Sequence, residues 1–308
     1  MKEGYFLLLP VISFMLLSCS GEDSPSDEFK KKWYAGKAEL SSYSLEQARY
    51  GEIRKGEATL IFVTEDFSKD KLVKLDEPEG TSNKQRVLKM NMTKSFVTGI
   101  YPYSMMLSVF TPVSKEGTAK TLKVVSSVQE WCGQTFSSLR LKGSSYNWQL
   151  QSYFEKEVEQ DKKLSGAIPE DELWNRIRMA PSTLPQGEVM LIPGLFWQRL
   201  SHAEMGEEEA VLSLAKADNS FIKDTAAHVY TIHYPHAQRT VQIYFSATSP
   251  YEIGGWQETY PDGFGGNKKV LTTKAVKKKT IWLDYWKHNK LSDSTYLHSL
   301  QLSRYDYQ

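Results

Sequence analysis

The residue types that carry most enzyme chemistry are present in this 308-residue sequence, but their spacing does not define a reaction. H-E-x-x-H, G-x-S-x-G and C-x-x-C motifs are all missing. S-x-x-K stretches begin at Ser68 and Ser213, yet they lack the companion S-D-N and K-T-G motifs of acyl-transfer sites. Acids such as Glu65, Asp66 and Glu130 could form the carboxylate pair of a glycosidase, but sequence spacing does not fix the distance between two carboxylates. We therefore predict no catalytic residue, and a non-catalytic role is favoured over an enzyme.

Three histidines, His228, His233 and His236, form the densest group of metal-ligand side chains, within "HVYTIHYPHAQRT". Imidazole nitrogens bind zinc, and a zinc site needs three or four such ligands held together. Pro235 separates a strand from a turn here, and no acid lies among the histidines. We interpret them as solvent-facing residues of a hairpin and predict neither a metal site nor a cofactor. Cys132 is one of two cysteines, and acylation of the other, Cys19, would leave it alone, so a disulfide framework is not expected.

The other cysteine follows a short apolar segment at the start of the chain. Lys2 precedes a nearly continuous apolar run, residues 5–17, which is too short for a membrane span of about 20 residues and is typical of a signal peptide. "LLSC", ending at Cys19, resembles the lipobox of bacterial lipoproteins, whose cysteine receives a diacylglyceryl group. The resemblance implies that residues 1–18 are a signal peptide and that Cys19 carries acyl chains such as palmitate, two or more of which anchor a protein stably. An ordinary signal peptide is the alternative.

The residues after the cysteine suggest where in the cell the protein is located. Residues 19–32 are polar and contain "SGEDSPSDEFKKK", a composition that predicts a flexible, lipidated tether. Ser20 and the acids that follow resemble the surface-export signal of Bacteroidota lipoproteins, which implies the outer membrane, on its periplasmic or its cell-surface side. The formal net charge of +1 gives no indication of a nucleic-acid partner. Six lysines between Lys268 and Lys279 are interpreted as a solvated strand face, with anionic glycan or lipid headgroups as the alternative contact.

Residues 33–302 have the pattern of a mainly β protein. In "VLKMNMT" and "YNWQLQ" apolar residues alternate with polar ones, which is the period of a half-buried strand. Most such runs are separated by turns that are too short for a crossover helix, so the strands should pair antiparallel. The fold class we predict is mainly β with a minor helical part: a curved antiparallel sheet, or an open barrel or sandwich, with one principal helix.

The principal helix is predicted from "IPEDELWNRIRMAP". Pro169 stands at its start, acids occupy the first turn, arginines the last, and Pro181 lies beyond. Leu173, Trp174 and Ile177 would form its inward face. The helix separates an earlier from a later set of strands, so residues 33–302 are either one domain or two subdomains divided near 168–181, followed by a tail at 303–308.

A glycine- and aromatic-rich segment, "TSPYEIGGWQETYPDGFGGNKK", is the candidate ligand-binding element. A connection of this length is usually functional or disordered, and its rings argue against disorder. We predict a loop, and the favoured interpretation is an Ω-like loop that buries its own rings. The alternative is a ligand loop whose aromatic residues contact a ligand. The residues concerned are Tyr251, Trp256, Tyr260 and Phe264.

Four stretches, "GEIRKGEATLIFVTEDF", "TGIYPYSMM", "VQEWCGQTF" and "GFGGNKKVLTTKA", resemble a family of uncharacterised Bacteroidota lipoproteins over most of the mature chain. Some members carry the label septum formation inhibitor Maf. Maf-type nucleotide pyrophosphatases open with a serine-x-serine-proline-arginine-arginine loop that grips phosphate, whereas this chain has "SPSDEF" at Ser24, so the label is a misnomer here.

These observations predict an envelope lipoprotein that acts as a membrane-tethered, non-catalytic binding or assembly module for a glycan, a lipid or an envelope protein. The alternatives are a periplasmic or surface hydrolase with a carboxylate pair, and a lipid carrier. A deep apolar cavity would favour the carrier, and two carboxylates facing each other across a polar cleft would favour the hydrolase.

Overall fold

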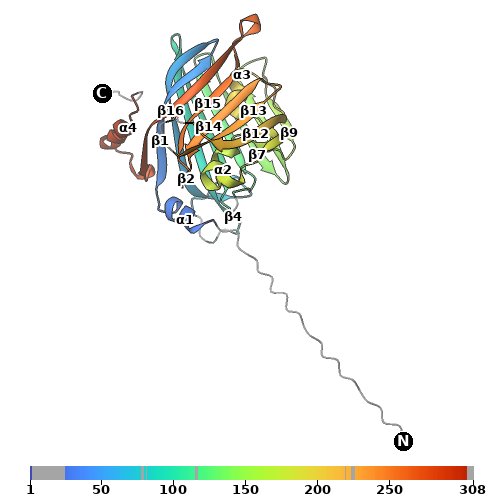
Figure 1. The fold of residues 1–308 in the computed structure, drawn as a ribbon, viewed down its shortest axis with the longest axis vertical. Coiled ribbons are helices and arrows are strands. Elements are labelled where there is room, and N and C mark those ends of the chain that lie inside the picture. Colours follow the sequence, from blue (N-terminus) through green and yellow to red (C-terminus); the bar gives the residue numbers. More distant parts are fainter. Residues whose placement is uncertain are drawn as a thin grey trace.

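A computed structural model describes residue 1 and residues 25–77, 80, 82–114, 117–218, 220–222 and 226–303. Within these residues the chain forms one large, mostly antiparallel sheet of 16 strands, accompanied by short helices (Figure 1). The predicted fold class, a mainly β protein with a curved antiparallel sheet, is confirmed. Cys19 and the predicted signal peptide after Met1 lie outside the described residues, so lipidation stays a prediction.

The strands belong to two successive groups along the chain. The first group is β1 (Ala38–Arg49), β2 (Glu52–Ser68), β3 (Val73–Lys74), β4 (Lys84–Thr98), β5 (Tyr101–Pro112), β6 (Lys123–Glu130), β7 (Gly133–Lys142), β8 (Ser145–Ser152) and β9 (Gln160–Leu164). The second is β10 (Ile168–Pro169), β11 (Gly187–Ile192), β12 (Glu208–Lys216), β13 (Ala227–Tyr234), β14 (Arg239–Ser246), β15 (Ile253–Asp262) and β16 (Lys269–Leu283).

The helices of the described residues are short. The α-helices are α1 (Asp27–Trp33), α2 (Glu172–Met179), α3 (Leu195–Ser201) and α4 (Thr295–Ser299), and the 3₁₀ helices are η1 (Pro181–Thr183), η2 (Gly265–Asn267), η3 (Tyr285–Lys287) and η4 (Leu291–Ser294). None of these helices is long and apolar enough to cross a membrane.

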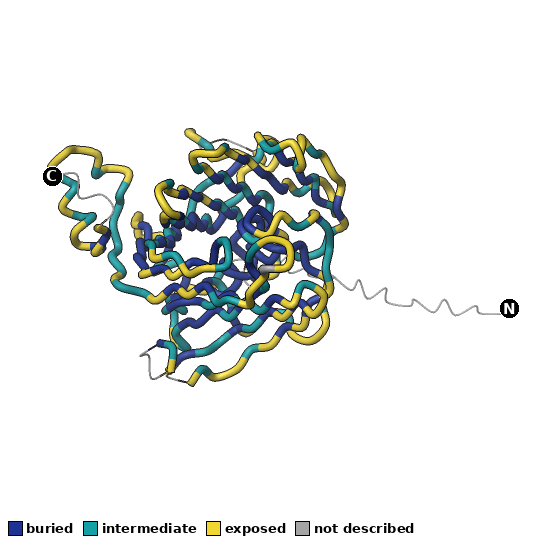
Figure 2. Tube along the Cα trace, turned by 90° about the horizontal axis from the view of Figure 1, so that it is seen from above, coloured by how far each residue is buried: buried dark blue, intermediate teal, exposed yellow. Residues whose placement is uncertain are grey.

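Strand order shows that the sheet curls around. The order runs from β10 through β11 to β16, then β1, β2 and β4 to β9, with β3 beside β2. The two outermost strands, β9 and β10, are separated in the chain by residues 165–167 alone. Because an extended residue spans at most about 3.6 Å, these two ends of the sheet cannot lie far apart. Seen from above, the tube has buried segments in its middle and exposed segments around them (Figure 2).

Antiparallel pairing places successive connections at alternate ends of the curled sheet. One end, which we call the mouth end, carries the connections β1–β2, β4–β5, β6–β7, β8–β9, β11–β12, β13–β14 and β15–β16. The opposite basal end carries the connections β2–β4, β5–β6, β7–β8, β12–β13 and β14–β15, together with α1, which precedes β1. Figure 1 shows α1 at the bottom of the molecule and the tip between β15 and β16 at the top.

Helix α2 lies inside the curl, where it contacts β4 and β5. The predicted inward residues Leu173, Trp174 and Ile177 are buried, as expected. The opposite side of the helix is buried too, and Asn175 donates to Leu88 O at 3.0 Å. The helix begins at Glu172 rather than at the predicted proline. Pro169 belongs to strand β10, where it pairs with Ile192 of β11.

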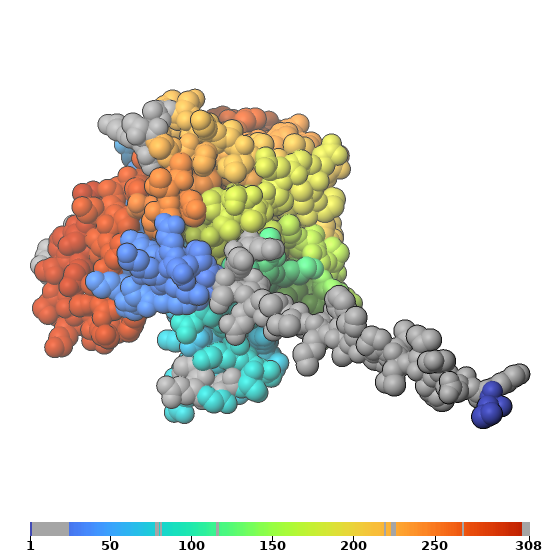
Figure 3. Space-filling view, turned by 60° about the horizontal axis from the view of Figure 1, so that its bottom comes forward, coloured from blue at the N-terminus to red at the C-terminus, as the bar shows by residue number. Residues whose placement is uncertain are grey.

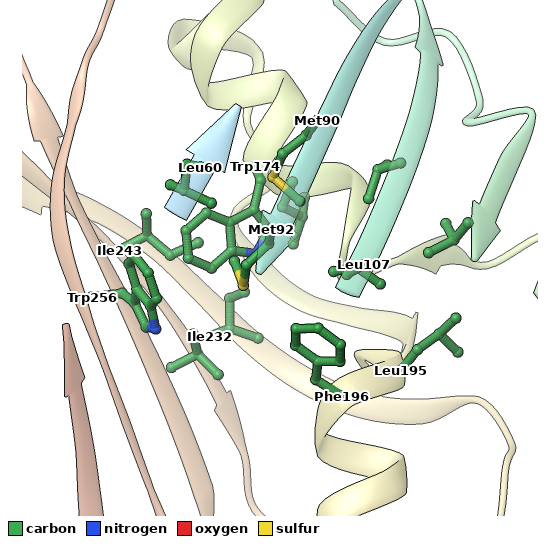
Figure 4. Packing of buried hydrophobic residues seen from close by; sticks show 14 of the residues in the cluster. Leu60, Met90, Met92, Leu107, Trp174, Leu195, Phe196, Ile232, Ile243 and Trp256 are labelled. Atoms are coloured by element: carbon green, nitrogen blue, oxygen red, sulfur yellow. The ribbon is translucent and has the colours of Figure 1, made fainter. Parts of the chain in front are cut away.

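One continuous hydrophobic cluster fills the interior and takes side chains from both strand groups and from α2 and α3. The segment 168–181, considered above as a boundary, contributes to the middle of this cluster. Figure 4 shows representative members around Trp174: Leu60, Met90, Met92, Leu107, Leu195, Phe196, Ile232, Ile243 and Trp256.

The later part of the segment predicted as a tether, residues 19–32, is helical. Helix α1 begins at Asp27, and Ser26 Oγ caps it by accepting from Phe29 N at 3.2 Å. Phe29 and Trp33, four residues apart and so on one face of the helix, are both buried. Residues 27–32 are therefore not part of a flexible tether. The burial of two aromatic side chains on one face stabilises a helix here, despite the many charged residues of the segment.

The chain after β16 packs back on the outside of the sheet. Leu300 and Leu302 cover Ala38, Leu40 and Val63 in a second, smaller cluster. Residues 304–308 of the predicted tail lie outside the described residues.

Candidate functional site

A cleft of about 570 Å³ opens at the mouth end and is the candidate site. Four connections supply its walls: β1–β2, α3 with the residues after it, β13–β14 and β15–β16. Its lining includes Arg49, Tyr50, Trp197, His236, Asp262 and Phe264.

The β1–β2 wall is a tight turn whose backbone conformation sets the direction of a tyrosine. Tyr50 and Gly51 have φ of 59° and 74°, as in the two-residue turns that match the twist of a β-hairpin. Asp262 Oδ2 accepts from Gly51 N at 2.6 Å, which ties this turn to the end of β15. The two neighbouring walls of the cleft are therefore fixed to each other.

A buried arginine organises the polar groups behind that turn. Arg49 donates through Nη1 to Leu200 O at 2.5 Å and through Nε to the Tyr103 hydroxyl at 3.3 Å. The Tyr50 and Tyr103 hydroxyls lie 2.8 Å apart, and burial together with this hydrogen bond raises the pKa of Tyr50. Arg49 thus links the β1–β2 turn to the end of α3 and holds Tyr50 in place.

Phe264 is the prominent exposed ring of the cleft. Its side chain is 60% exposed, although its centroid lies 5.6 Å from that of Tyr50 and 6.0 Å from that of His202. A large apolar ring left this open to water, beside a second ring and a polar cleft, is available for stacking on a ligand.

The His202 ring is in turn held by a carboxylate. Its Nδ1 lies 2.7 Å from Glu157 Oε1, and Arg199 Nη1 lies 3.3 Å from the same oxygen. Burial opposes ionisation of Glu157, but hydrogen bonds from His202 and Ser152, with the charge of Arg199, outweigh it and lower the pKa of Glu157. The connection between β8 and β9 therefore supports the cleft from outside.

Beneath the cleft lies a buried group of charges. Arg239 makes a two-point ion pair with Glu170, at 2.5 and 2.7 Å, and its Nε donates to Glu258 at 2.7 Å. The Tyr234 hydroxyl donates to Glu170 at 2.6 Å. Trp197 lines both the cleft and this lower region, with its ring 4.9 Å from the Arg239 guanidinium.

The space among these charges is small. It measures about 30 Å³, enough for an internal water but not for a sugar or an acyl chain. Burial, followed by the charge of Glu170, raises the pKa of Asp171 to about 7, while Leu195 N donates to it at 3.1 Å. Burial also lowers the pKa of Lys94. We regard this region as support for the cleft floor.

The predicted aromatic loop is corrected by the structure. Its central part is strand β15, in which the side chains of Trp256 and Tyr260 are both buried. Trp256 packs on Tyr43 at 4.9 Å and on Trp174 at 5.3 Å between ring centroids. The glycines suggested a loop, but Gly255 lies within the strand. It is a glycine because a Cβ there would come within 2.4 Å of Ala275 O on β16.

Two of the four predicted residues reach the cleft, and two do not. Phe264 and Tyr260 line it, whereas Trp256 is a core residue. Tyr251 belongs to the β14–β15 connection at the basal end and packs against the main cluster.

The three histidines that are close in the sequence do not come together at one site. His233 is exposed and bonds Thr240, while His236 alone of the three lines the cleft. Across the described residues no cluster of three or more His, Cys, Asp or Glu side chains is placed to hold a metal ion.

Sequence reasoning missed Arg49, Tyr50 and Trp197. The "RYGE" turn offered a local signal, since a Gly after an aromatic residue between two strands suggests a hairpin. No local signal related that turn to α3, which lies about 150 residues away in the chain.

Comparisons with known proteins add little. No family model matches the sequence, and no curated protein matches it. Among solved structures, a porin-like protein from Bacteroides uniformis ATCC 8492 is similar at 9% identity, over 79% of this chain and 95% of that one, with a TM-score of 0.22. A TM-score this low does not establish a shared fold.

Proposed function

We propose that this protein is an envelope lipoprotein, tethered to the outer membrane through Cys19 and related to the Bacteroidota family named above, that binds a glycan in the mouth cleft without turning it over. The observation that carries the ligand class is the exposed Phe264 ring beside Tyr50, at the edge of a cleft lined by charged groups. Sugars combine apolar faces with many hydroxyls, and such a lining offers partners for both.

The size and rigidity of the cleft support this proposal. Ligand sites commonly measure about 300 to 1,000 Å³, and are usually formed before the ligand arrives. The hydrogen bonds from Gly51 to Asp262 and from Arg49 to Leu200 fix the walls of this cleft in advance. Pre-formed walls reduce the entropy that binding must overcome.

The carboxylates of the cleft do not favour the hydrolase. Asp262 accepts from Gly51 N at 2.6 Å, and Glu208 accepts from Ala237 N at 3.1 Å. These two already hold backbone connections together. Glu204, the third carboxylate of the lining, lies 3.4 Å from Lys162 Nζ, whereas a glycosidase needs two carboxylates free to face the scissile bond. The lipid carrier is not favoured either, because side chains fill the interior of the described fold.

The test compares Phe264→Ala with Trp131→Ala. Both rings are exposed at the mouth end, at 60% and 69%, but Trp131 does not line the cleft. All described helices and strands lie between Asp27 and Ser299, so a chain beginning at Ser20 retains them. Its binding to peptidoglycan fragments and envelope polysaccharides would be measured on an array and by calorimetry.

We expect Phe264→Ala to weaken the Kd about ten-fold, which corresponds to about 1.4 kcal/mol of lost ring contact. Trp131→Ala should leave it unchanged. Equal binding by wild type and Phe264→Ala would remove the cleft from the proposal. Release of smaller sugars during the same incubations would instead support the hydrolase.

A further inference from the structure

The basal end carries a surface with its own character, which we call the basal face. It consists of helix α1, the loop 34–37, the described residues of the β2–β4 connection (69–77, 80, 82 and 83) and η3. Figure 3, with this end turned forward, shows α1 between the C-terminal segment and the β2–β4 connection. None of these elements contributes to the mouth cleft.

Exposed lysines dominate the charge of the basal face. Lys31, Lys37, Lys69 and Lys71 are exposed, and within the described part of the chain their ammonium groups have no hydrogen-bond or ion-pair partner. Lys74 and Lys84 extend the same surface.

Several acids of the basal face are already engaged by neighbours. Asp27 pairs with Lys30 at 3.7 Å, and Asp284 with Lys287 at 3.1 Å. Asp70 accepts from the Asn83 side chain. Glu28, Asp76 and Glu77 are further exposed acids of this face. Counted with Lys84 and Asp284, its described residues hold nine lysines and six acids, which leaves a net positive charge.

Apolar side chains project among these lysines. Tyr34, Val73 and Trp286 are exposed by 40%, 44% and 47%. Trp and Tyr rings together with lysines are the residues enriched where proteins meet the boundary between lipid headgroups and acyl chains. The mouth end also exposes apolar residues, such as Phe264 and Trp131.

The position of the N-terminal segment favours a lipid bilayer as the partner of the basal face. The described fold begins at Pro25, next to α1, and Cys19 precedes Pro25 by six residues. Six residues span at most about 22 Å, so an acylated Cys19 would keep the basal face close to a bilayer. Electrostatic attraction to lipid falls off within about 8 to 10 Å at ordinary salt.

We propose that the basal face docks on anionic lipid headgroups, so that the domain stands on the bilayer with its mouth end directed away. Lys31, Lys37, Lys69 and Lys71 supply the attraction, and Trp286 and Tyr34 enter the headgroup layer. This surface acts in addition to the acyl anchor proposed at Cys19, on which the choice of a bilayer rests, and it does not depend on what the cleft binds.

The test uses the chain beginning at Ser20, which lacks the lipid. It is sedimented with vesicles of phosphatidylcholine alone or with about one-third phosphatidylglycerol, a simple anionic lipid. Two double variants are compared: Lys69→Glu with Lys71→Glu on the basal face, and Lys268→Glu with Lys269→Glu at the mouth end. Both change the net charge equally, and all four positions are exposed.

We expect binding only to the anionic vesicles, weakening as salt is raised. The basal double variant should bind at least about 25-fold more weakly, at about five-fold per lysine, and the mouth variant should differ by less than about two-fold. Trp286→Ala should cause a smaller loss that persists at high salt, because it removes apolar contact rather than charge.

Equal losses in the two double variants would show attraction to net charge alone and would overturn the proposal. So would a failure to bind anionic vesicles, or binding to an anionic polysaccharide in their place. Circular dichroism of each variant checks that the sheet is retained. Glycan binding by the basal variant should be normal, so failure of this proposal and failure of the proposed function give different results.

Discussion

The two ends of the curled sheet are built from the same kind of connection but present different chemistry. At the mouth end, turns and α3 surround a polar cleft with Phe264 at its edge. At the basal end, α1 and the β2–β4 connection present lysines without partners. A net charge of +1 for the whole chain conceals this separation. The comparison teaches that charge must be counted by surface, since partners meet one end of the molecule at a time.

The comparison extends into the interior, where each end has a buried ion pair. Near the basal end, Arg178 binds Glu39 at 2.5 and 2.6 Å, and the guanidinium also lies 4.7 Å from the Phe62 ring. Under the mouth, Arg239 binds both Glu170 and Glu258. One arginine thus neutralises one carboxylate at the basal end and serves two at the mouth end.

The largest expected effect comes from removing these arginines. Leaving one carboxylate buried without its partner costs about 3 to 5 kcal/mol, which is the loss we expect for Arg178→Met. Arg239→Met should lower the free energy of unfolding further, because two carboxylates lose their partner. Denaturant unfolding measures both, and a smaller loss for Arg239→Met would contradict the idea that the mouth end depends more on its arginine. Adding Glu170→Gln to Arg239→Met should recover part of the loss.

A smaller effect is expected from pH, through the carboxyl group beneath the mouth. Burial and then Glu170 raise the pKa of Asp171 to about 7, whereas an aspartate in an unfolded chain titrates near pH 4. Between about pH 4 and pH 7 the unfolded state binds fewer protons, so the free energy of unfolding falls as pH rises through this window.

Asp171→Asn should remove that dependence, because the amide resembles the protonated acid and keeps an acceptor for Leu195 N. The variant should gain up to about 4 kcal/mol relative to the wild type between pH 4 and pH 7. Unfolding curves of both proteins at the two pH values measure the difference. Parallel pH profiles would show that Asp171 does not titrate in this range.

The smallest effect is expected at the start of the basal face. Ser26→Ala removes the side-chain acceptor of Phe29 N and should cost about 1 kcal/mol. Hydrogen exchange of the α1 amides should accelerate about five-fold, in keeping with that free energy. Ser292→Ala, an exposed serine in η4, is the control. Unchanged exchange in Ser26→Ala would mean that Phe29 and Trp33 alone hold α1.

Local periodicity predicted much of the fold. Alternation in the β4 and β8 segments identified strands, since each packs one face on the core, and Leu173, Trp174 and Ile177 identified the side of α2 that is buried. Helix α1 was missed because lysines and acids outnumber its two aromatic residues, yet Phe29 and Trp33 four residues apart were the informative pair.

The candidate site was less predictable, for a topological reason. Phe264 was selected because it lies in a segment rich in glycine and aromatic residues, but its partner Tyr50 lies more than 200 residues earlier in the chain. Only the pairing of β1 with β16 brings their two turns together. The glycines of β15 suggested a loop because glycine is common in flexible loops. In this strand, glycine is needed where the backbone of a neighbouring strand comes close.

That same pairing of β1 with β16 governs how the protein must be made. One of the first strands to be synthesised has to wait for the last, because Ala38 pairs with Leu283. Contacts of such sequence separation form slowly, and until then β1 and β15 each have an open edge that could pair with another copy of the chain. A chain shortened before Lys269 would keep both edges open, so its expected fate is aggregation rather than a smaller version of the fold.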